Sequence, residues 1–172
     1  MRSILDTYIR DIPDFPQPGI IFKDITPLIE DSGAFRLAIT SFETLVQDVR
    51  IDKIVGIESR GFLFGAPLAD RLGVGFAMAR KKDKLPGDRI AVTYDLEYGT
   101  NTIEIQKDSI KEDEHVLIID DVLATGGTAN AVCSLIEQLG GKVSAMAFLM
   151  ELSFLDGRKR LAGRDVLRLI EY

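Results

Sequence analysis

The stretch HVLIIDDVLATGGT, residues 115–128, indicates both the fold and the position of a ligand site. Its apolar residues 116–119 form a run typical of a buried strand in a parallel sheet. Asp120 and Asp121 follow at the carboxyl end of that strand, where open α/β sheets bind ligands. A glycine-containing turn and a helical pattern come next. The stretch therefore predicts a strand, an acidic pair, a turn and a helix in succession.

The acidic pair and the turn together predict a ribose 5-phosphate site. Two adjacent carboxylates can accept hydrogen bonds from neighbouring sugar hydroxyls, or organise water around a metal ion. Glycines let backbone N–H groups approach a phosphate closely, the amino-terminal end of a helix is electropositive, and threonine hydroxyls add donors. The patterns GxGxxG and GxxxxGK followed by Ser or Thr are both absent. The predicted phosphate-binding turn consists of Ala124, Thr125, Gly126, Gly127 and Thr128.

Strands and helices alternate on either side of this stretch. Apolar runs and helical periodicity predict strands at residues 51–59, 75–81, 114–123 and 142–152, and helices at residues 33–49, 61–73 and 127–140. This order is typical of parallel crossover units. We therefore expect an α/β fold with a mostly parallel central sheet flanked by helices.

Two segments depart from the alternation. Residues 82–110 combine period-two alternation with turn signals, and predict a hairpin that projects from the sheet rather than a core element. At the amino terminus, apolar residues recur at helical spacing through residues 4–12 and predict an amphipathic helix that ends before Pro13. A turn-rich segment with an irregular path follows, and loops of this kind often carry ligand contacts.

Composition limits the class of protein. The 172 residues, 46% hydrophobic and 28% charged, fit one globular domain. A net charge of −6 argues against a general nucleic-acid binder but permits a small anionic ligand. The lone Cys133 lies in an apolar helical pattern and is expected in the core, without a disulfide. Asp6 and Asp11 interrupt the apolar amino terminus, and no apolar run reaches membrane-spanning length, so we expect a cytoplasmic protein without a membrane partner.

Residues 115–128 resemble the phosphoribosyl-pyrophosphate motif of the type I phosphoribosyltransferases, and the resemblance extends through most of the chain. Blocks similar to those of the adenine-specific members occur in the same order: IPDFPQPGIIFKDITPL, ESRGFLFGAPLA, RKKDKLPG, YDLEYG, IQKD and MELSFLDGR. The resemblance implies a single phosphoribosyltransferase domain over residues 1–172, with an amino-terminal hood at 1–33 and a core at 34–172. It also implies a mobile hairpin lid at 82–100.

The resemblance implies transfer of the 5-phosphoribosyl group from 5-phosphoribosyl 1-pyrophosphate to adenine, which gives AMP and pyrophosphate in purine salvage. It further implies a homodimer, and a Mg²⁺ ion held mainly through the substrate. The base would lie against Phe22 and Leu152, with main-chain groups near Ile21 and Lys23 at its edge. Oxopurine enzymes of this superfamily carry an acid where this chain has Ala124, which weakens a hypoxanthine or guanine specificity.

The chain also contains two candidate pyrophosphate contacts. Glu58, Ser59 and Arg60 end a predicted strand, and a backbone N–H nest with an arginine at such a turn suits an oxyanion. In the family this loop holds pyrophosphate, often with a cis peptide, which corresponds here to the Glu58–Ser59 bond. A basic cluster follows the next predicted strand, and its resemblance to the family implies pyrophosphate contacts, with the arginine crossing a dimer interface. This cluster consists of Arg80, Lys81, Lys82 and Lys84.

Glu97 matches the family's proton-transfer glutamate on the mobile loop, and Tyr98 beside it is included among the substrate-binding residues. Two other functions stay open: a phosphoribosyltransferase for xanthine or hypoxanthine, and a non-catalytic regulator that senses phosphoribosyl pyrophosphate. His115 is expected to be structural. The basic run at residues 158–160 is interpreted as surface.

Overall fold

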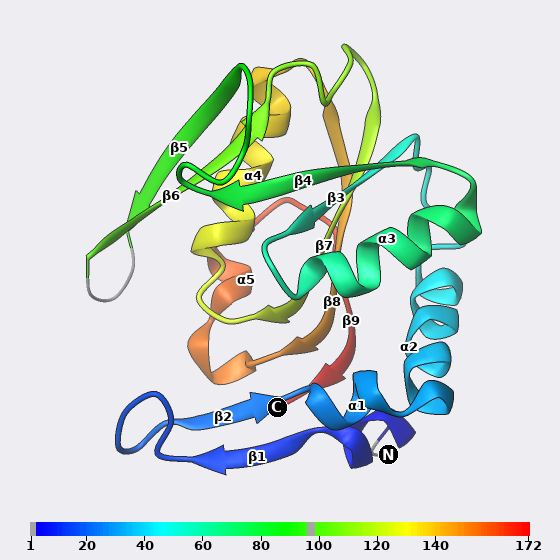
Figure 1. The fold of residues 1–172 in the computed structure, drawn as a ribbon, viewed down its shortest axis with the longest axis vertical. Coiled ribbons are helices and arrows are strands. Elements are labelled where there is room, and N and C mark those ends of the chain that lie inside the picture. Colours follow the sequence, from blue (N-terminus) through cyan, green and yellow to red (C-terminus); the bar gives the residue numbers. More distant parts are fainter. Residues whose placement is uncertain (1–2, 96–98) are drawn as a thin grey trace.

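A twisted sheet at the centre of the molecule carries the predicted site (Figure 1). The structure is a computed structural model that describes residues 3–95 and 99–172. Within those residues the strands are β1 (Arg10–Pro13), β2 (Ile21–Asp24), β3 (Lys53–Ile57), β4 (Gly75–Lys81), β5 (Arg89–Asp95), β6 (Thr100–Gln106), β7 (His115–Leu123), β8 (Lys142–Glu151) and β9 (Val166–Glu171).

The strand order of the large sheet confirms the predicted mostly parallel arrangement. In the described residues seven strands pair in the order β5-β6-β4-β3-β7-β8-β9. The neighbours from β4 through β9 run parallel, whereas β6 is antiparallel to both β4 and β5. Strands β1 and β2 form a separate antiparallel pair. The carboxyl ends of β3 and β7 are neighbours, which places the segments after them at one edge of the sheet.

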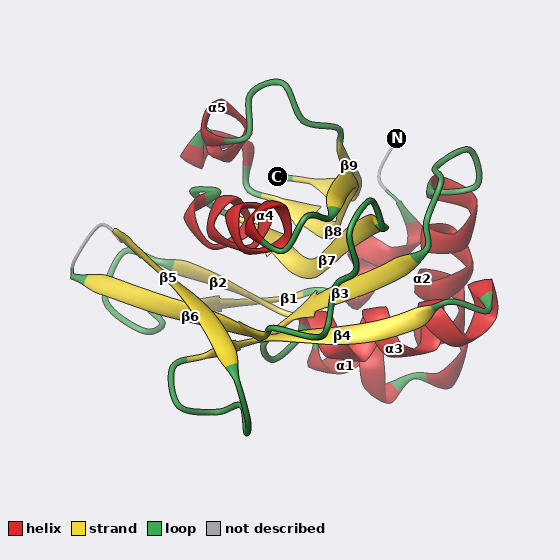
Figure 2. Ribbon diagram, turned by 90° about the horizontal axis from the view of Figure 1, so that it is seen from above, coloured by secondary structure: helices red, strands yellow, loops and turns green. Residues whose placement is uncertain are grey.

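Helices cover both faces of the sheet, with α1 to α3 on one side and α4 and α5 on the other (Figure 2). Strand β7 explains this layering, because Val116 and Ile118 pack with α4 while Leu117 and Ile119 pack with α2 and α3. Burial on both faces accounts for its unbroken apolar run. The helices are η1 (Ile4–Tyr8), α1 (Thr26–Glu30), α2 (Ser32–Leu45), α3 (Gly61–Leu72), α4 (Gly127–Gln138), η2 (Ser153–Leu155) and α5 (Gly157–Arg160).

Cys133 lies on the buried face of α4, in the core, as its sequence context predicts. It is fully buried, and burial raises the pKa of its thiol to about 11. His115 is at the start of β7, where its Nδ1 lies 3.1 Å from the Ser144 hydroxyl. Both residues are therefore parts of the scaffold.

The prediction of an amphipathic helix through residues 4–12 holds only for residues 4–8, which form a 3-10 helix with Leu5 buried. The 3-10 helix η1 ends at Tyr8, and Ile9 already has extended backbone. Residues from Arg10 onward pair with β2, because Arg10 lies opposite Asp24 and donates hydrogen bonds to its carboxylate. Helical spacing of apolar residues thus gives way to strand pairing at this point. The segment expected to be irregular contains β2 and α1, and the edge strand β9 was not predicted at all.

The predicted hairpin exists, but its base belongs to the sheet. Strands β5 and β6 pair along their whole length, and β6 also pairs with β4 at Glu104 and Ile103. Ile103 and Ile105 are buried in the core with α4. The prediction of a projecting, non-core element therefore holds for the distal half of the hairpin only. The alternation of apolar and polar residues in the sequence predicts the two strands, but it does not predict which half of the hairpin packs against the core.

Candidate functional site

The acidic pair and the glycine turn lie together at the carboxyl end of β7. Gly126 adopts a left-handed conformation with φ of +79° and is the N-cap residue of α4. A side chain there would also strike Gly157, since an added Cβ would lie 2.5 Å from its carbonyl oxygen. The turn encloses a cavity of about 140 Å³, which includes Asp120 in its lining. The predicted turn residues Ala124, Thr125, Gly126, Gly127 and Thr128 all line it.

Asp120 and Asp121 differ in their charge environment. Burial, together with the neighbouring charge of Asp121, raises the pKa of Asp120 well above its usual value. Burial also raises the pKa of Asp121, although Arg60 opposes this shift. The Arg60 Nε lies 2.9 Å from Asp121 Oδ2. Asp121 is therefore paired directly with Arg60, whereas Arg60 acts on Asp120 only through a weaker electrostatic attraction.

The loop after β3 faces the same acidic pair. Its Glu58–Ser59 peptide bond is cis, in agreement with the expectation from the family. A cavity of about 310 Å³ is lined by residues from this loop, from β4, from β5 and β6, and from β7 and α4. Its lining includes the predicted residues Glu58, Ser59, Arg60, Lys81, Asp120, Asp121 and Thr128.

Glu58 joins this loop to the basic cluster. The Lys81 backbone N–H donates to Glu58 Oε2 at 2.9 Å, and Arg80 lies 3.3 Å from the same atom. Burial alone would raise the pKa of Glu58, but these hydrogen bonds outweigh burial and lower the pKa. Arg80 also donates to the Lys84 carbonyl. Arg80 and the exposed Lys84 are not among the residues that line the cavity.

A third and larger cavity separates the hood from the core. Its volume is about 810 Å³, and residues from β2, the glycine turn and the segment after β8 line it. Of the residues predicted to contact a base, Ile21, Lys23, Ala124 and Leu152 lie in this lining. Thr125 lines both this cavity and the phosphate turn. The cavity of the phosphate turn therefore shares lining residues with each of the other two cavities.

Phe22 lies outside the lining of this cavity. Its ring packs edge-to-face against Phe15, with 5.1 Å between the ring centroids, and the Arg60 guanidinium lies 5.1 Å over the same ring. Contact between Phe22 and a base stays a prediction. Glu97 and Tyr98 lie outside the described residues.

Several lining residues were missed by sequence reasoning. Tyr94 and Asn101 from the hairpin line the cavity of the cis-peptide loop, and the Thr128 hydroxyl donates to the Tyr94 hydroxyl at 3.0 Å. Phe154 and Tyr172 line the hood cavity. Strand alternation assigns Tyr94 to the inner face of β5, which was the available signal for that residue. Tyr172 has no comparable signal in the sequence.

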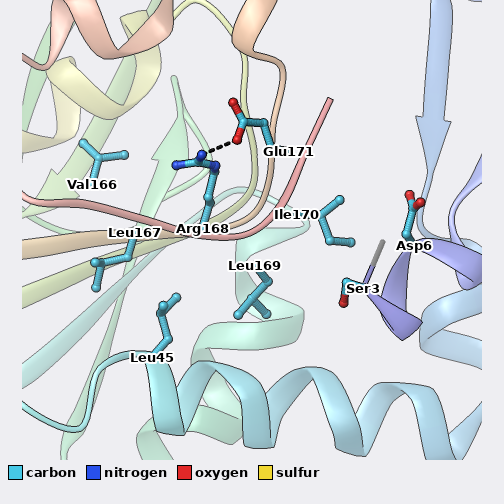
Figure 3. A pocket seen from close by; sticks show the side chains of 9 residues that line it. All are labelled: Ser3, Asp6, Leu45, Val166, Leu167, Arg168, Leu169, Ile170 and Glu171. Carbon is cyan, nitrogen blue, oxygen red and sulfur yellow. Dashed lines mark hydrogen bonds and ion pairs between the residues drawn. The ribbon is translucent and has the colours of Figure 1, made fainter. Parts of the chain in front are cut away.

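A further cavity of about 600 Å³ lies along β9 beside η1 (Figure 3). Ser3, Asp6, Leu45 and residues 166–171 line it, and Arg168 pairs there with Glu171. None of the predicted site residues belongs to this lining. In residues 3–95 and 99–172 no group of three or more His, Cys, Asp or Glu side chains is arranged to hold a metal ion. None of the helices formed by these residues is both long and apolar enough to cross a membrane.

Comparisons with known proteins agree with this geometry. Residues 29–163 match the family model described as phosphoribosyl transferase domain. An adenine phosphoribosyltransferase of Carboxydothermus hydrogenoformans is 54% identical over 168 residues, which cover 98% of this chain and 99% of that protein. The crystal structure of the enzyme from Thermoanaerobacter pseudethanolicus has a TM-score of 0.96 at 51% identity, with 98% of each chain covered.

A solved structure from Saccharomyces cerevisiae is similar as well. It is an adenine phosphoribosyltransferase complexed with adenine and an imino-altritol bisphosphate. Its TM-score is 0.89 at 44% identity, and the match covers 94% of each chain. Sequence and fold agree over nearly the whole length. The chain therefore belongs to the phosphoribosyltransferase family, and within that family to the adenine phosphoribosyltransferases.

Proposed function

We infer that the protein transfers the 5-phosphoribosyl group of 5-phosphoribosyl 1-pyrophosphate to adenine, and releases AMP and pyrophosphate. The observation that carries this inference is that the cavity of the phosphate turn shares lining residues with both of the other cavities. One cavity has phosphate-binding geometry, one combines acids with cations, and one is lined mainly by apolar side chains. A phosphoribosyl group that spans the first two would present its anomeric carbon to a base in the third.

The glycine turn and the acidic pair account for binding of the phosphoribosyl group. Backbone N–H groups at the start of α4, with the hydroxyls of Thr125 and Thr128, are suitable donors for the 5-phosphate. The carboxylate of Asp120, which lines both cavities, is suited to accept hydrogen bonds from ribose hydroxyls. Arg60 and Lys81 supply positive charge for the pyrophosphate in the adjoining cavity.

The hood cavity accounts for the base. Ala124 supplies no acid to an oxopurine, and Leu152 supplies an apolar surface. The relative from Saccharomyces cerevisiae was solved with adenine, which supports adenine as the base here. A specificity for xanthine or hypoxanthine would need a hydrogen-bonding group at Ala124. No observation favours a non-catalytic regulator.

Bond formation requires one proton to leave the base. The ring nitrogen of adenine forms a bond to the anomeric carbon as the bond from that carbon to pyrophosphate breaks, and the proton on that nitrogen must be accepted. We assign this role to Glu97, from its match to the family. Closure of the hairpin would desolvate the carboxylate and make it a better acceptor.

A Mg²⁺ ion bound with the substrate fits the donors present. Hard cations prefer oxygen ligands, and Asp120 and Asp121 offer carboxylates beside the ribose position. We propose that pyrophosphate and ribose oxygens provide most of the ligands, with these two acids as neighbours. The ion would neutralise charge on the departing pyrophosphate.

A homodimer and a cytoplasmic location complete the proposal. Leu63 on α3 and Met78 on β4 expose 39% and 40% of their surfaces, and Met78 shares its strand face with Phe76 and Arg80. An apolar face beside Arg80 suits a second copy of the chain. Light scattering of a Met78→Asp variant tests the dimer, which should dissociate. The free, buried Cys133 suits a reducing compartment, and cell fractionation tests the location.

Pyrophosphate release, measured with each purine base in turn and with magnesium present, tests the central proposal. Adenine should support turnover, whereas hypoxanthine, guanine and xanthine should not. Equal turnover with an oxopurine would overturn the specificity assigned to Ala124. Absence of turnover with every base would overturn the enzymatic function.

A further inference from the structure

Arg160, at the end of α5, lies against the phosphate turn, although sequence reasoning assigned it to the surface. Figure 1 shows α5 beside the amino-terminal end of α4. A Cβ added to Gly126 would lie 3.4 Å from Arg160 Cβ, and one added to Gly127 would lie 3.2 Å from Arg160 Nη1. The exposed side chain therefore runs along the turn, and its guanidinium ends beside Gly127.

Tyr94 approaches the same glycine from the hairpin. The added Cβ of Gly127 would lie 3.4 Å from Tyr94 Cδ2. The phosphate turn is thus flanked by a cation from α5 and by an aromatic ring from β5. A side chain at position 127 would be crowded by both groups, so a glycine there keeps them close to the turn.

Within residues 3–95 and 99–172 the charge on Arg160 has no acidic partner. Arg158 pairs with Glu151, and Lys159 pairs with Asp156. Among the described residues no hydrogen bond or ion pair involves the Arg160 side chain, and the first turn of α4 contains no acidic residue. A cation beside a helix amino terminus is electrostatically unfavourable, because the helix dipole is positive at that end. A bound anion would resolve this conflict.

We propose that Arg160 is a further phosphate-binding residue, which contacts the 5-phosphate of phosphoribosyl pyrophosphate and of AMP. This proposal rests on the proposed function. A dianionic phosphate held by the α4 backbone would have Arg160 alongside, and guanidinium donors form strong, charge-assisted hydrogen bonds to phosphate oxygens. The residue belongs to the 5-phosphate side, since the pyrophosphate cations Arg60 and Lys81 line a different cavity.

Calorimetry with AMP and adenosine tests the proposal, because the two ligands differ only in the 5-phosphate. Arg160→Gln should weaken AMP binding about tenfold, the range for loss of one charged hydrogen bond at an accessible site. Adenosine binding should not change. In steady-state kinetics the KM for phosphoribosyl pyrophosphate should rise by a similar factor, while the KM for adenine stays the same. Arg160→Lys should retain part of the AMP affinity that Arg160→Gln loses, because lysine keeps the positive charge but lacks the planar, two-pronged donor group of arginine.

Lys159→Gln is the matched control, since it removes the same charge from the adjacent exposed position. It should bind AMP as the unmodified protein does. AMP binding by Arg160→Gln at the unmodified affinity would overturn the proposal. So would equal weakening of AMP and adenosine, which would show that Arg160 orders the cavity instead. If the unmodified protein binds no AMP, the proposed function fails rather than this contact. Circular dichroism checks that each variant is folded. If Arg160→Gln is unfolded, the AMP and adenosine affinities of Arg160→Lys test the proposal instead.

Discussion

Glu97 is the residue on which the chemical step depends in our proposal. Glu97→Gln should lower turnover by roughly 10²- to 10⁴-fold, because the amide cannot accept the ring proton. Affinity for phosphoribosyl pyrophosphate should stay nearly intact, since its proposed contacts lie on the loop after β3, β4, β7 and α4 and do not include Glu97. Steady-state kinetics with adenine measures both quantities. Asp95→Asn is the control, because Asp95 is exposed at the end of β5. Near-native turnover of Glu97→Gln would show that positioning and charge stabilisation alone supply the rate.

The Asp120 carboxylate is expected to favour substrate binding but to destabilise the folded protein. Its raised pKa means that the folded protein disfavours the charged form, so the carboxylate destabilises the fold at neutral pH. Asp120→Asn should therefore raise the melting temperature while it weakens phosphoribosyl-pyrophosphate binding far more than adenine binding. Calorimetry on each ligand and a thermal melt measure these effects. Equal loss of both ligands, or a lowered melting temperature, would show that the acid supports the fold.

The sequence predicts the residues of the site that belong to one continuous motif. Asp120, Asp121 and the turn after them follow directly from a buried strand and a glycine pattern. Arg160 and Tyr172 reach the site from distant segments, through packing of α5 and β9. A local sequence pattern does not indicate which distant segments will pack beside it. The positions of these two residues are therefore known only from the folded structure.

At the scale of elements, the hairpin β5–β6 is anchored at its base, and its distal half contacts α4 through the hydrogen bond between Tyr94 and Thr128. Its base pairs with β4 at only two positions, and Ile103 and Ile105 are buried. Strand β5 forms the outer edge of the sheet. Substrate should slow hydrogen exchange in β5 and at residues 100–102, because closure would add contacts to this half. Residues 103–106 serve as the internal control and should stay protected throughout. Unchanged exchange across β5 would count against a lid.

Elements differ in how strongly the sequence predicts them. The apolar runs of β3, β7 and β8 are strong signals, because burial on both faces removes polar residues from those strands. Strand β9, VLRLIE, lies at the open edge of the sheet, and Arg168 interrupts its apolar residues, so its signal is weaker. In β1 the pairing with β2 overrides a helical spacing of apolar residues, since short segments gain more from tertiary hydrogen bonds than from local periodicity.

At the scale of the whole molecule, the hood is attached to the core through polar contacts on both sides of the base cavity. Lys23 lies 3.8 Å over the ring of Tyr172, and the Tyr172 hydroxyl donates to Asp6. The backbone of Tyr172 bonds to Glu151 and Ser153, on either side of Leu152. One residue therefore connects the hood to the segment that lines the base cavity. Tyr172→Ala should lower the melting temperature, whereas Tyr172→Phe, which keeps the ring, should lower it less.

Asp24 makes the stability of the hood depend on pH. The carboxylate is buried, and it accepts hydrogen bonds from the Thr26 hydroxyl at 2.6 Å and from the Thr26 backbone N–H at 2.9 Å. These bonds, with a smaller contribution from Arg10, lower the pKa of Asp24 from 3.8 to about 2. A carboxyl whose pKa is lower in the folded state stabilises the fold above its unfolded pKa, and this contribution is lost as the pH falls through the folded pKa. The contribution is therefore complete above about pH 5 and disappears between about pH 4 and pH 2.

Asp24→Asn should accordingly lower the free energy of unfolding by at most about 2 kcal/mol at pH 6, and by progressively less as the pH is lowered from about 4 toward 2. Urea unfolding at a series of pH values measures the difference between the two proteins. Asp113→Asn is the control, because Asp113 forms an exposed pair with Lys142, and such pairs contribute little to stability. A difference between Asp24→Asn and the unmodified protein that stays constant from pH 6 to pH 3 would contradict the assignment. The neutral hydrogen-bonding geometry around Thr26, rather than the charge of Asp24, would then hold the hood on the core.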